Sequence, residues 1–459
     1  MKIGENLEKN VKQAFVGKVI DLLDNNPEEN VGKIFSLVKK LTYDEGSKQT
    51  IDFVYKMYQT NKPTYDYIQN ILQTGDKKCV KKLFTNFFAN AIWFGGEKRK
   101  QYLTDEDTKI PFVILLSPTM RCNLSCTGCY AATYDKNDDI PYEEVDRIVK
   151  EARALGIYYF VILGGEPFLD KVLLDIYEKY NDVIFTPFTN GTLFDDALAD
   201  RLKTLGNVFP MFSLEGFEKE TDARRGAGTF QKVMQSMDLL RERGVFFGVS
   251  SAATRSNMDI VSSDEFIDML TEKGSKLSWY FIYMPVGKEP DVNMMLTPEQ
   301  RIELGRRVRH IRTEKPYFAI DFFNDAPYVG GCIAGKYYCH INSREDVEPC
   351  IFAHFACNNL KGKSLLDVFR SPFFKMLRHK QPYNDNLLLP CMMIDNPGKI
   401  REIVQETGAY PTDDSARQMT SDPKFMQQLD QLAEDFKPYA EKAWEKDFNK
   451  TGNLDMAKG

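Results

Sequence analysis

The sequence predicts an α/β protein: an open partial (β/α)6 barrel with an all-helical N-terminal region and a small cysteine-rich C-terminal extension. From about residue 110, short runs rich in β-branched and aromatic residues alternate with amphipathic helical patterns, which is typical of βα units and a parallel sheet. There are six such runs, too few for a closed eight-unit barrel but enough for an open one. Five cysteines between residues 332 and 391 mark the extension.

The first part of the chain, residues 1–105, is predicted to be helical. Its clearest signal is an apolar face that repeats at i, i+3, i+4 and i+7. The residues on that face are Val80, Leu83, Phe84, Phe87, Phe88, Ala91 and Ile92. Because glycine commonly ends a helix, Gly95-Gly96 is expected to end this one.

The barrel is predicted over residues 106–318. The helical patterns between its strands end at glycines, among them Gly156 and Gly244. On such a sheet the active groups lie at the carboxyl ends of the strands, so residues that directly follow a strand are the candidates for chemistry. The candidate strands are 111–117, 158–163, 183–189, 208–214, 245–251 and 277–284.

Two more segments complete the predicted organisation. Residues 319–400 form a cysteine-rich region with scattered glycines and asparagines, and residues 401–459 form a charged helical tail. The tail carries one apolar helical face, which predicts a helix that packs against the rest of the protein. That face consists of Phe425, Leu429, Leu432, Phe436 and Tyr439.

Composition narrows the function classes. The 459 residues carry a net charge of −6, which argues against nucleic-acid binding as the main function. There is no run of 18 apolar residues, and the N-terminus MKIGENLEKNVKQ lacks the apolar segment of a secretion signal. A cytoplasmic protein is therefore expected. In that reducing compartment, nine cysteines favour metal or redox chemistry over disulfides.

The segment SPTMRCNLSCTGCYAATY places Cys122, Cys126 and Cys129 on the loop after the first predicted strand. Three thiolates close together suit a soft metal or an iron–sulfur cluster. A structural zinc site would fill all four positions, yet no fourth Cys or His lies in this loop. With a [4Fe–4S] cluster, one iron would stay free of protein ligands and could coordinate a substrate or cofactor. Zinc with a ligand from elsewhere in the chain is the alternative.

This C-x3-C-x2-C pattern after a first strand resembles the signature of radical S-adenosylmethionine (SAM) enzymes, and the resemblance covers roughly residues 110–395. It implies a [4Fe–4S] cluster whose open iron chelates the methionyl part of SAM. Reductive cleavage of SAM would then give a 5′-deoxyadenosyl radical that abstracts hydrogen from an unactivated C–H bond. A low-potential electron donor such as flavodoxin or ferredoxin is implied as a partner.

Further motifs follow in the family's order. GGEP (164–167) ends the second strand and resembles the glycine-rich SAM motif; this implies that Gly164 and Gly165 admit the methionyl amino group and that Glu166 supplies a carboxylate. A simple tight turn is the alternative. SLEG (213–216) resembles the segment that reaches the SAM ribose. That resemblance assigns the ribose to Ser213 and Glu215, with Asn190, Arg225 and Ser250 as further candidates. For Asn190 and Arg225, a turn asparagine and a solvated arginine are the alternatives.

One position departs from the family pattern. The family often has an aromatic residue just before the third cysteine, stacking near the adenine, and here that position is Gly128. Tyr130, just after Cys129, is the candidate to take over this contact.

The region 331–391 resembles the C-terminal auxiliary-cluster extension of radical SAM enzymes, which has a long form (SPASM) and a short form (twitch). The matching pieces are C-x-A-G, EPC, N-x-K-x-K-S-L, S-P-F-F-x-x-L-R and LLLPC. Five cysteines without the dense run of the long form imply one auxiliary [4Fe–4S] cluster. Cys332, Cys350 and Cys391 match best, and Cys339 and Cys357 compete as fourth ligand. A three-cysteine site open to substrate is the alternative, and a structural role is favoured for His354.

Three function hypotheses remain. The first is radical SAM chemistry on a peptide or protein. The second is the same chemistry on a lipid-like substrate, with peripheral membrane contact through residues 77–100, which carry an aromatic face with Trp93 and seven basic residues against one Glu. Packing of that helix on the barrel is its alternative. The third, a non-catalytic iron–sulfur electron carrier, is disfavoured because a carrier has no use for an open iron beside GGEP.

Overall fold

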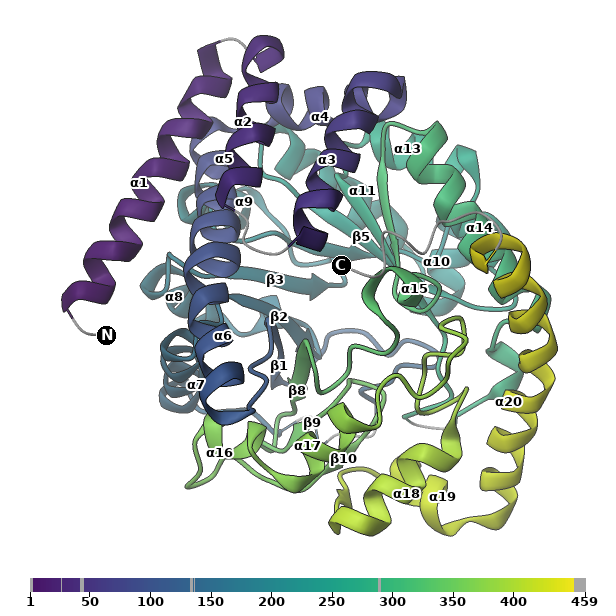
Figure 1. The fold of residues 1–459 in the computed structure, drawn as a ribbon. Coiled ribbons are helices and arrows are strands. Elements are labelled where there is room, and N and C mark those ends of the chain that lie inside the picture. Colours follow the sequence, from purple (N-terminus) through teal and green to yellow (C-terminus); the bar gives the residue numbers. More distant parts are fainter. Residues whose placement is uncertain are drawn as a thin grey trace.

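The computed structural model describes residues 3–25, 27–41, 45–132, 135, 137–287 and 290–449 (Figure 1). Within these residues the centre of the fold is a nine-stranded sheet in the order β7-β6-β5-β4-β3-β2-β1-β8-β9. Its strands are β1 (Val113–Thr119), β2 (Tyr159–Gly164), β3 (Ile184–Thr189), β4 (Met211–Ser213), β5 (Gly248–Ala253), β6 (Leu277–Ile282), β7 (Phe318–Asp321), β8 (Tyr338–Ile341) and β9 (Val347–Glu348). A separate antiparallel pair joins β10 (Phe355–Ala356) to β11 (Tyr410–Pro411).

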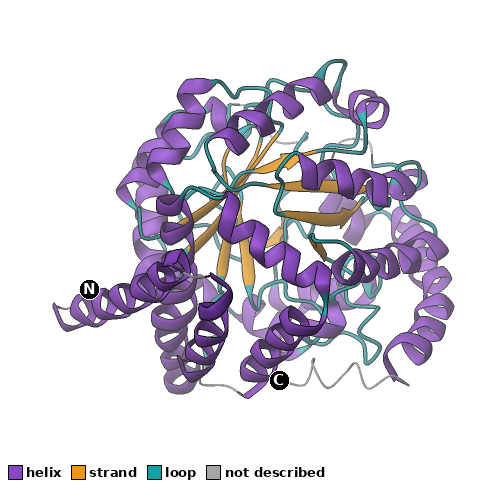
Figure 2. Ribbon diagram, turned by 90° about the horizontal axis from the view of Figure 1, so that it is seen from above, coloured by secondary structure: helices purple, strands orange, loops and turns teal. Residues whose placement is uncertain are grey.

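The sheet is an open parallel barrel, as predicted. Strands β1 to β7 pair in parallel with their sequence neighbours, β8 joins the free edge of β1 in parallel, and β9 runs antiparallel to β8. The end strands β7 and β9 are not paired with each other, so the sheet does not close. Figure 2 shows the strands spread in a fan with helices around the outside. The sequence prediction of six strands missed β7, β8 and β9 of this sheet.

Two strand boundaries differ from the prediction. Only Met211–Ser213 of the predicted strand 208–214 forms β4. The predicted strand 245–251 starts at Gly248, because the amide of Val245 instead donates to the carbonyl of Leu240 and closes the preceding helix. Apolar residues at a helix end and at a strand start look alike in sequence, so the pattern alone could not separate them.

Helices cover the outer face of the sheet. Helix α7 illustrates why they form: Val145, Ile148, Val149 and Ala152 all lie on its buried face. The helices between the strands are α7 (Tyr142–Ala154), α8 (Val172–Lys179), α9 (Asp196–Leu205), α10 (Glu218–Arg225), α11 (Thr229–Glu242), α12 (Met258–Val261), α13 (Asp264–Glu272), α14 (Pro298–Glu314) and α15 (Ala326–Val329), with short 3₁₀ turns at Pro167–Leu169 and Val292–Met294.

The N-terminal region is all-helical, as predicted, in α1 (Ile3–Asn25), α2 (Pro27–Leu41), α3 (Glu45–Thr60), α4 (Lys62–Thr74), α5 (Lys77–Phe84), the π-helical stretch η1 (Thr85–Phe94) and α6 (Gly95–Glu106). The expected stop at Gly95-Gly96 is wrong, because the helix continues into α6. Gly95 serves close packing: a Cβ there would lie 2.3 Å from the carbonyl oxygen of Gly156. Val80, Leu83 and Phe94 are buried, so part of the 77–100 face packs inward.

The C-terminal extension follows the barrel along the β8–β9 edge, and its last long helix packs on α14 (Figure 1). Its helices are α16 (Leu365–Phe369), α17 (Pro372–His379), α18 (Pro397–Thr407), α19 (Asp414–Ser421) and α20 (Pro423–Trp444), followed by η4 (Glu445–Asn449). On α20, Phe425, Leu429 and Phe436 are buried as predicted, whereas Tyr439 is exposed. Residues 450–459 of the predicted tail lie outside the described residues. None of the described helices combines the length and the apolar character needed to cross a bilayer.

Candidate functional site

The first cysteine group lies on the loop that leaves the carboxyl end of β1. The side chains of Cys122, Cys126 and Cys129 are half-buried and close enough to influence one another. Burial raises the pKa of Cys122 and of Cys126, and neighbouring thiols add to both shifts. At Cys126 the guanidinium groups of Arg225 and Arg224 act in the opposite direction and favour the thiolate. The structure therefore brings the three predicted cysteines together.

The cysteine loop is fastened to the GGEP turn by backbone hydrogen bonds. The amide of Gly165 donates to the carbonyl of Thr119 at 2.9 Å, and the amide of Glu166 donates to that of Arg121 at 2.8 Å. A Cβ on Gly164 would lie 2.2 Å from the Thr119 oxygen, and one on Gly165 would lie 2.0 Å from the Arg121 oxygen. Glycine is therefore required at both positions because the cysteine loop packs directly against them. The contact of these glycines with the methionyl amino group stays a prediction.

Glu166 links the ends of β2 and β3. Its buried carboxylate accepts hydrogen bonds from the Thr189 hydroxyl at 2.7 Å, the Asn190 amide at 2.7 Å and the Phe168 amide at 3.1 Å. Burial raises the pKa of Glu166, although these donors act against the shift. The Asn190 side chain in turn donates to Asn123 at 2.8 Å and to Cys122 Sγ at 3.8 Å. Glu166 thus holds Asn190 against the cysteine loop.

Glu215 and two arginines border the other side of the loop. Oε1 of Glu215 accepts from both Arg224 and Arg225 at 2.5 Å, while Oε2 is buried and has no hydrogen-bond partner among the described residues. Burial alone would raise the pKa of Glu215, but the two guanidinium groups outweigh it and lower that pKa. Arg225 is mostly buried in this ion pair, so the solvated alternative is wrong.

The surroundings of Glu215 leave one buried acceptor for a ligand, and its assignment to the ribose of SAM stays a prediction. A buried acceptor without a donor is costly, and a ribose hydroxyl would satisfy Oε2. Ser213 ends β4, and its register partner Ser250 lies within the neighbouring strand β5, so these two predicted ribose candidates come from adjacent strands close to Glu215 in sequence or register. Sequence reasoning missed Arg224, although the Arg-Arg pair in RRGAGTF was a visible signal.

Two tyrosines flank the position where the family has its aromatic residue. A Cβ on Gly128 would lie 2.8 Å from the ring of Tyr283, which follows β6. Tyr130 points elsewhere: its hydroxyl accepts from the Gly164 amide at 3.5 Å, and its ring centroid lies 6.3 Å from that of Phe352. The adenine contact of Tyr130 stays a prediction. Tyr283 was missed, because nothing in the local motif connects it with the cysteine loop.

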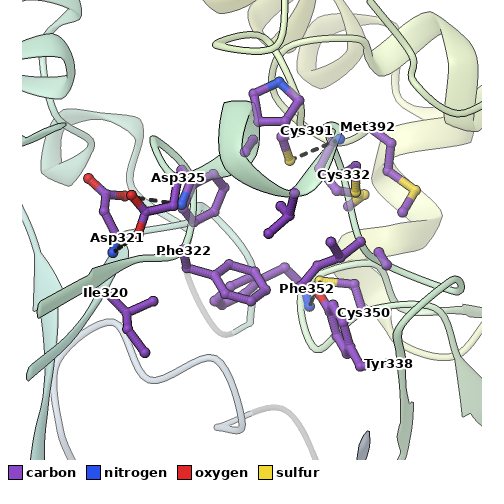
Figure 3. Close-up of a pocket in the computed structure, with 18 of the residues that line it drawn as sticks. Ile320, Asp321, Phe322, Asp325, Cys332, Tyr338, Cys350, Phe352, Cys391 and Met392 are labelled. Carbon is purple, nitrogen blue, oxygen red and sulfur yellow. Dashed lines mark hydrogen bonds between the residues drawn. The ribbon is translucent and has the colours of Figure 1, made fainter. Parts of the chain in front are cut away.

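The second cysteine group borders a cavity of about 150 Å³ (Figure 3). Cys332, Cys350 and Cys391 line it together with apolar and aromatic residues, among them Phe322 and Phe352. Burial raises the pKa of Cys332 to about 12 and also raises those of Cys350 and Cys391. Three of the predicted auxiliary cysteines therefore face one enclosed, largely apolar space.

The two competitors for the fourth position lie elsewhere. Cys339 is on β8, opposite Ile114 of β1, fully buried and not part of the cavity lining. Cys357 donates through Sγ to the carbonyl of Thr407 at 3.7 Å. The structure brings neither of them to the cavity.

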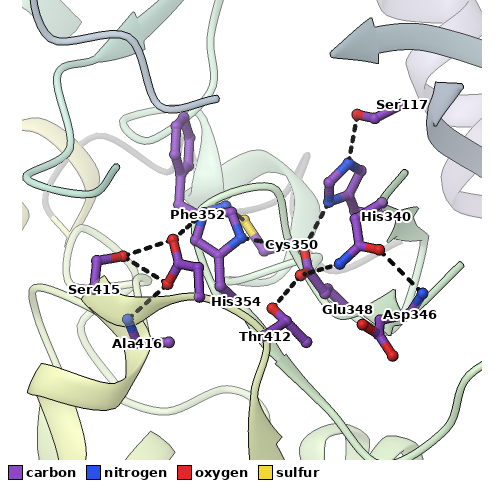
Figure 4. A network of polar contacts seen from close by, with 12 residues as sticks. Ser117, His340, Asp346, Glu348, Cys350, Phe352, His354, Thr412, Ser415 and Ala416 are labelled. Atoms are coloured by element: carbon purple, nitrogen blue, oxygen red, sulfur yellow. Dashed lines mark hydrogen bonds and ion pairs between the residues drawn. The ribbon is translucent and has the colours of Figure 1, made fainter. Parts of the chain in front are cut away.

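His354 belongs to a buried polar network that joins the extension to the barrel (Figure 4). Glu348 is its centre, with Oε2 at 2.7 Å from His340 Nδ1 and 3.3 Å from His354 Nδ1. His340 Nε2 also lies 2.8 Å from the hydroxyl of Ser117 on β1. Burial would raise the pKa of Glu348, but both histidines lower it strongly, and Glu348 in turn raises the pKa of His354. His354 is thus placed in a structural network, away from the cavity lining.

The donor sets fit iron–sulfur clusters. Among the described residues, no group of three or more Cys, His, Asp or Glu side chains converges on a point where a single metal ion could sit. A [4Fe–4S] cluster spreads its thiolates over separate iron atoms, so its cysteines need to be neighbours but need not converge. Both groups consist of cysteines alone, which is the ligand type such clusters take.

The comparison with known families decides the identity of the barrel. Residues 116–283 match the profile of the Radical SAM superfamily. This segment is a radical SAM domain. Members of the superfamily are enzymes that use a [4Fe–4S] cluster and SAM. The radical SAM domain contains the first cysteine group and the strand ends around it, whereas Cys332, Cys350 and Cys391 lie beyond the matched residues.

Individual relatives of the radical SAM domain are distant. Over 257 residues, the chain is 25% identical to Fe-coproporphyrin III synthase of Methanosarcina barkeri, covering 52% of this chain and 64% of the relative. Over 281 residues, it is 29% identical to the sporulation killing factor maturation protein SkfB of Bacillus subtilis, covering 57% and 65%. Both matches span just under two thirds of the relative's length.

A solved structure supports the fold. The crystal structure of Streptococcus suis SuiB bound to precursor peptide SuiA superimposes with a TM-score of 0.56 at 19% identity, covering 70% of this chain and 79% of SuiB. At that identity the similarity shows the architecture, and it extends beyond the radical SAM domain.

Proposed function

We propose that this chain binds a [4Fe–4S] cluster through Cys122, Cys126 and Cys129, binds SAM beside it, and acts on a C–H bond of a peptide or protein. The observation that carries the proposal lies at the carboxyl edge of the sheet, where the three-cysteine loop is fastened to the GGEP turn and is joined through Arg224 to Glu215. Oε2 of Glu215 is buried and has no hydrogen-bond partner among the described residues. When bound, the cluster and SAM would supply hydrogen-atom abstraction from an unactivated C–H bond.

The protein's own residues would bind and orient SAM. The amides of Gly164, Gly165 and Glu166 already donate within the protein, so the turn would meet the methionyl amino group through its backbone carbonyls. Glu166 keeps that turn joined to Asn190 and the cysteine loop. Glu215 would accept a ribose hydroxyl through Oε2 while Arg224 and Arg225 hold its charge. Ser213, two residues before Glu215, and its register partner Ser250 are the further candidates for the ribose.

The proposal includes a second, auxiliary cluster in the cavity at Cys332, Cys350 and Cys391. Apolar and aromatic side chains line the cavity around these thiols. Burial raises all three thiol pKa values, and binding to a metal would stabilise the thiolate forms that burial disfavours. The proposal does not extend to Cys339, because its side chain faces the core beside β1.

A peptide substrate is supported by two of the compared proteins. SkfB is named for maturation of the sporulation killing factor, and SuiB was solved with a precursor peptide. The similarity to Fe-coproporphyrin III synthase favours a second candidate, a tetrapyrrole substrate. Incubation with SAM, reductant and either a precursor peptide or an iron tetrapyrrole precursor separates the two, because mass spectrometry then shows either a modified peptide or newly formed Fe-coproporphyrin III. The lipid-like alternative through 77–100 stays a prediction.

Iron counting tests the two-site proposal. After anaerobic reconstitution, the wild-type chain should hold two [4Fe–4S] clusters, and the triple variant Cys122→Ala, Cys126→Ala, Cys129→Ala should keep about half the iron. Cys79→Ala is a matched control, since that buried thiol belongs to neither cysteine group and donates to the Lys203 carbonyl, so its loss should leave the iron content unchanged. A triple variant that binds no iron, or zinc in both proteins, would contradict the proposal.

A further inference from the structure

A tyrosine hydroxyl lies against one sulfur of the second cysteine group. The Oη of Tyr338 donates a hydrogen bond to Cys350 Sγ at 2.9 Å. Tyr338 is 2% exposed, and its ring packs edge-on against Phe322 with centroids 5.8 Å apart. Figure 3 shows both side chains at the wall of the cavity. The donor is therefore shielded from solvent that would otherwise compete for it.

The position of this hydroxyl is fixed by the sheet. Tyr338 is the first residue of β8 and pairs in parallel register with Val113 of β1. Backbone amides also donate to the sulfurs of Cys350 and Cys391, among them those of Phe352 at 3.5 Å and Met393 at 3.3 Å. Among the described residues, the side-chain donor to a sulfur of this group is therefore Tyr338. Its oxygen–sulfur distance is shorter than the nitrogen–sulfur distances of Phe352 and Met393.

Hydrogen bonds to ligating sulfurs shift the reduction potential of an iron–sulfur site. The donor stabilises negative charge on the sulfur, and the reduced site carries one more negative charge than the oxidised site. The reduced state therefore gains more from the bond, so the potential rises. The effect is strong in a buried, apolar setting, because little solvent screens the interaction.

We propose that Tyr338 sets the reduction potential of the auxiliary site through its hydrogen bond to Cys350, and makes that site a readier electron acceptor than its three thiolates would be alone. Tyr338 is a positioning residue, since it contacts Cys350, a proposed ligand of the cluster, and does not contact the reacting atoms. The inference rests on the proposed second cluster at Cys332, Cys350 and Cys391.

The test is a redox titration of the reconstituted full chain, followed by electron paramagnetic resonance, for wild type, Tyr338→Phe and Tyr383→Phe. The auxiliary signal is the one that persists when Cys122, Cys126 and Cys129 are replaced by Ala. Tyr338→Phe should shift its midpoint potential in the negative direction. Tyr383→Phe is the matched control: Tyr383 is also buried near these thiols, but its hydroxyl bonds the Leu377 carbonyl and Met392 Sδ.

A second substitution should shift the midpoint potential of the auxiliary site in the opposite direction. Incorporation of 3-fluorotyrosine at position 338 makes the phenol a stronger donor and should shift the potential in the positive direction. Equal potentials in wild type and Tyr338→Phe, with full iron content in both, would overturn the inference and leave the proposed function intact. Loss of only the auxiliary iron in Tyr338→Phe would also overturn it, since Tyr338 would then be a folding residue. Absence of auxiliary iron in the wild-type chain would instead refute the proposed second cluster, and the inference with it.

Discussion

At the scale of single residues, the two carboxylate oxygens of Glu215 have different surroundings. Oε1 receives both arginines, while Oε2 stays buried without a donor among the described residues. A buried carboxylate is stable only when paired charge offsets its lost hydration. The two arginines supply that charge and fix the orientation of the carboxylate, and Arg224 also donates to the Thr127 carbonyl of the cysteine loop.

Replacing Glu215 with Gln should therefore cost stability as well as SAM affinity. Removing one partner of a buried ion pair typically costs about 3–5 kcal/mol, and a similar loss in the free energy of unfolding is expected at pH 7. The pKa of Glu215 is lowered from its ordinary value of 4.5, so its stabilisation is complete above that value and is lost as pH falls toward the folded-state pKa. The gap between wild type and variant should narrow below pH about 4.5.

Chemical unfolding at pH 7 and at lower pH measures this gap, and SAM titration measures the affinity. Glu178→Gln is the control, because Glu178 forms an exposed pair with Arg201 and should change stability by no more than about 1 kcal/mol. A gap that widens on acidification would contradict the assigned direction of the pKa shift.

At the scale of elements, the decisive contact lies between the GGEP turn and the loop that follows β1. The turn's amides bond to the backbone on either side of Met120, immediately before Cys122. The glycines of the turn are needed because any side chain would push this loop away. The spacing of the cysteines is therefore not sufficient to form the site. The turn at the end of β2 must also leave room for the cysteine loop and hydrogen-bond to it.

Gly165→Ala should disturb the first cysteine group. Its Cβ would meet the Arg121 carbonyl oxygen at 2.0 Å, so the loop must shift, at a cost of about 1–3 kcal/mol or more. Iron at the first site and SAM binding should fall, while auxiliary iron is retained. Gly398→Ala is the control: its Cβ meets nothing within 4 Å, so stability should stay equal or rise by up to about 1 kcal/mol. Normal iron and SAM affinity in Gly165→Ala would refute the fastening role.

The secondary structure also shows which features local sequence patterns predict and which they do not. The alternation of strands and helices predicted the open barrel, because local period and strand-end position carry that information. Strand β8 is only Tyr338–Ile341, and its partner β1 lies far away in sequence, so no local pattern announces the pairing. For the same reason Tyr283 and Tyr338 were not foreseen. Tyr283 lies against Gly128 and Tyr338 donates to Cys350, and both are tertiary contacts between residues far apart in sequence.

At the scale of the whole molecule, two cysteine groups from separate parts of the chain share one sheet. The first follows β1, and Cys350 follows β9, which is joined to β1 through β8. The Glu348 network adds a second connection, from Ser117 of β1 to His340 and Glu348. The two proposed clusters are thus held on a common rigid frame while their ligands remain separate.

Separate ligand sets should allow the two activities to be uncoupled. Cys350→Ala is expected to keep SAM cleavage, because the first cysteine group is intact, and to abolish turnover of the substrate. Independent measurement of 5′-deoxyadenosine and of modified product checks this. If both persist, the second group takes no part in the chemistry. If both are lost, a melting curve shows whether the variant has unfolded, since an unfolded variant has no thermal transition. A folded variant that makes neither product would show that SAM cleavage depends on the second cysteine group.

The pairing of β1 with β8 also sets the timing of assembly on the ribosome. Val113 and its partner Tyr338 are about 225 residues apart; at a synthesis rate of about 5–20 residues per second, the second emerges about 11–45 s after the first. During that interval β2 can cover one edge of β1, but the other edge has no partner. An unpaired strand edge is a template for association with other chains. The nascent protein therefore passes through a long vulnerable period, and its yield should depend on chaperones that shield this edge until β8 arrives.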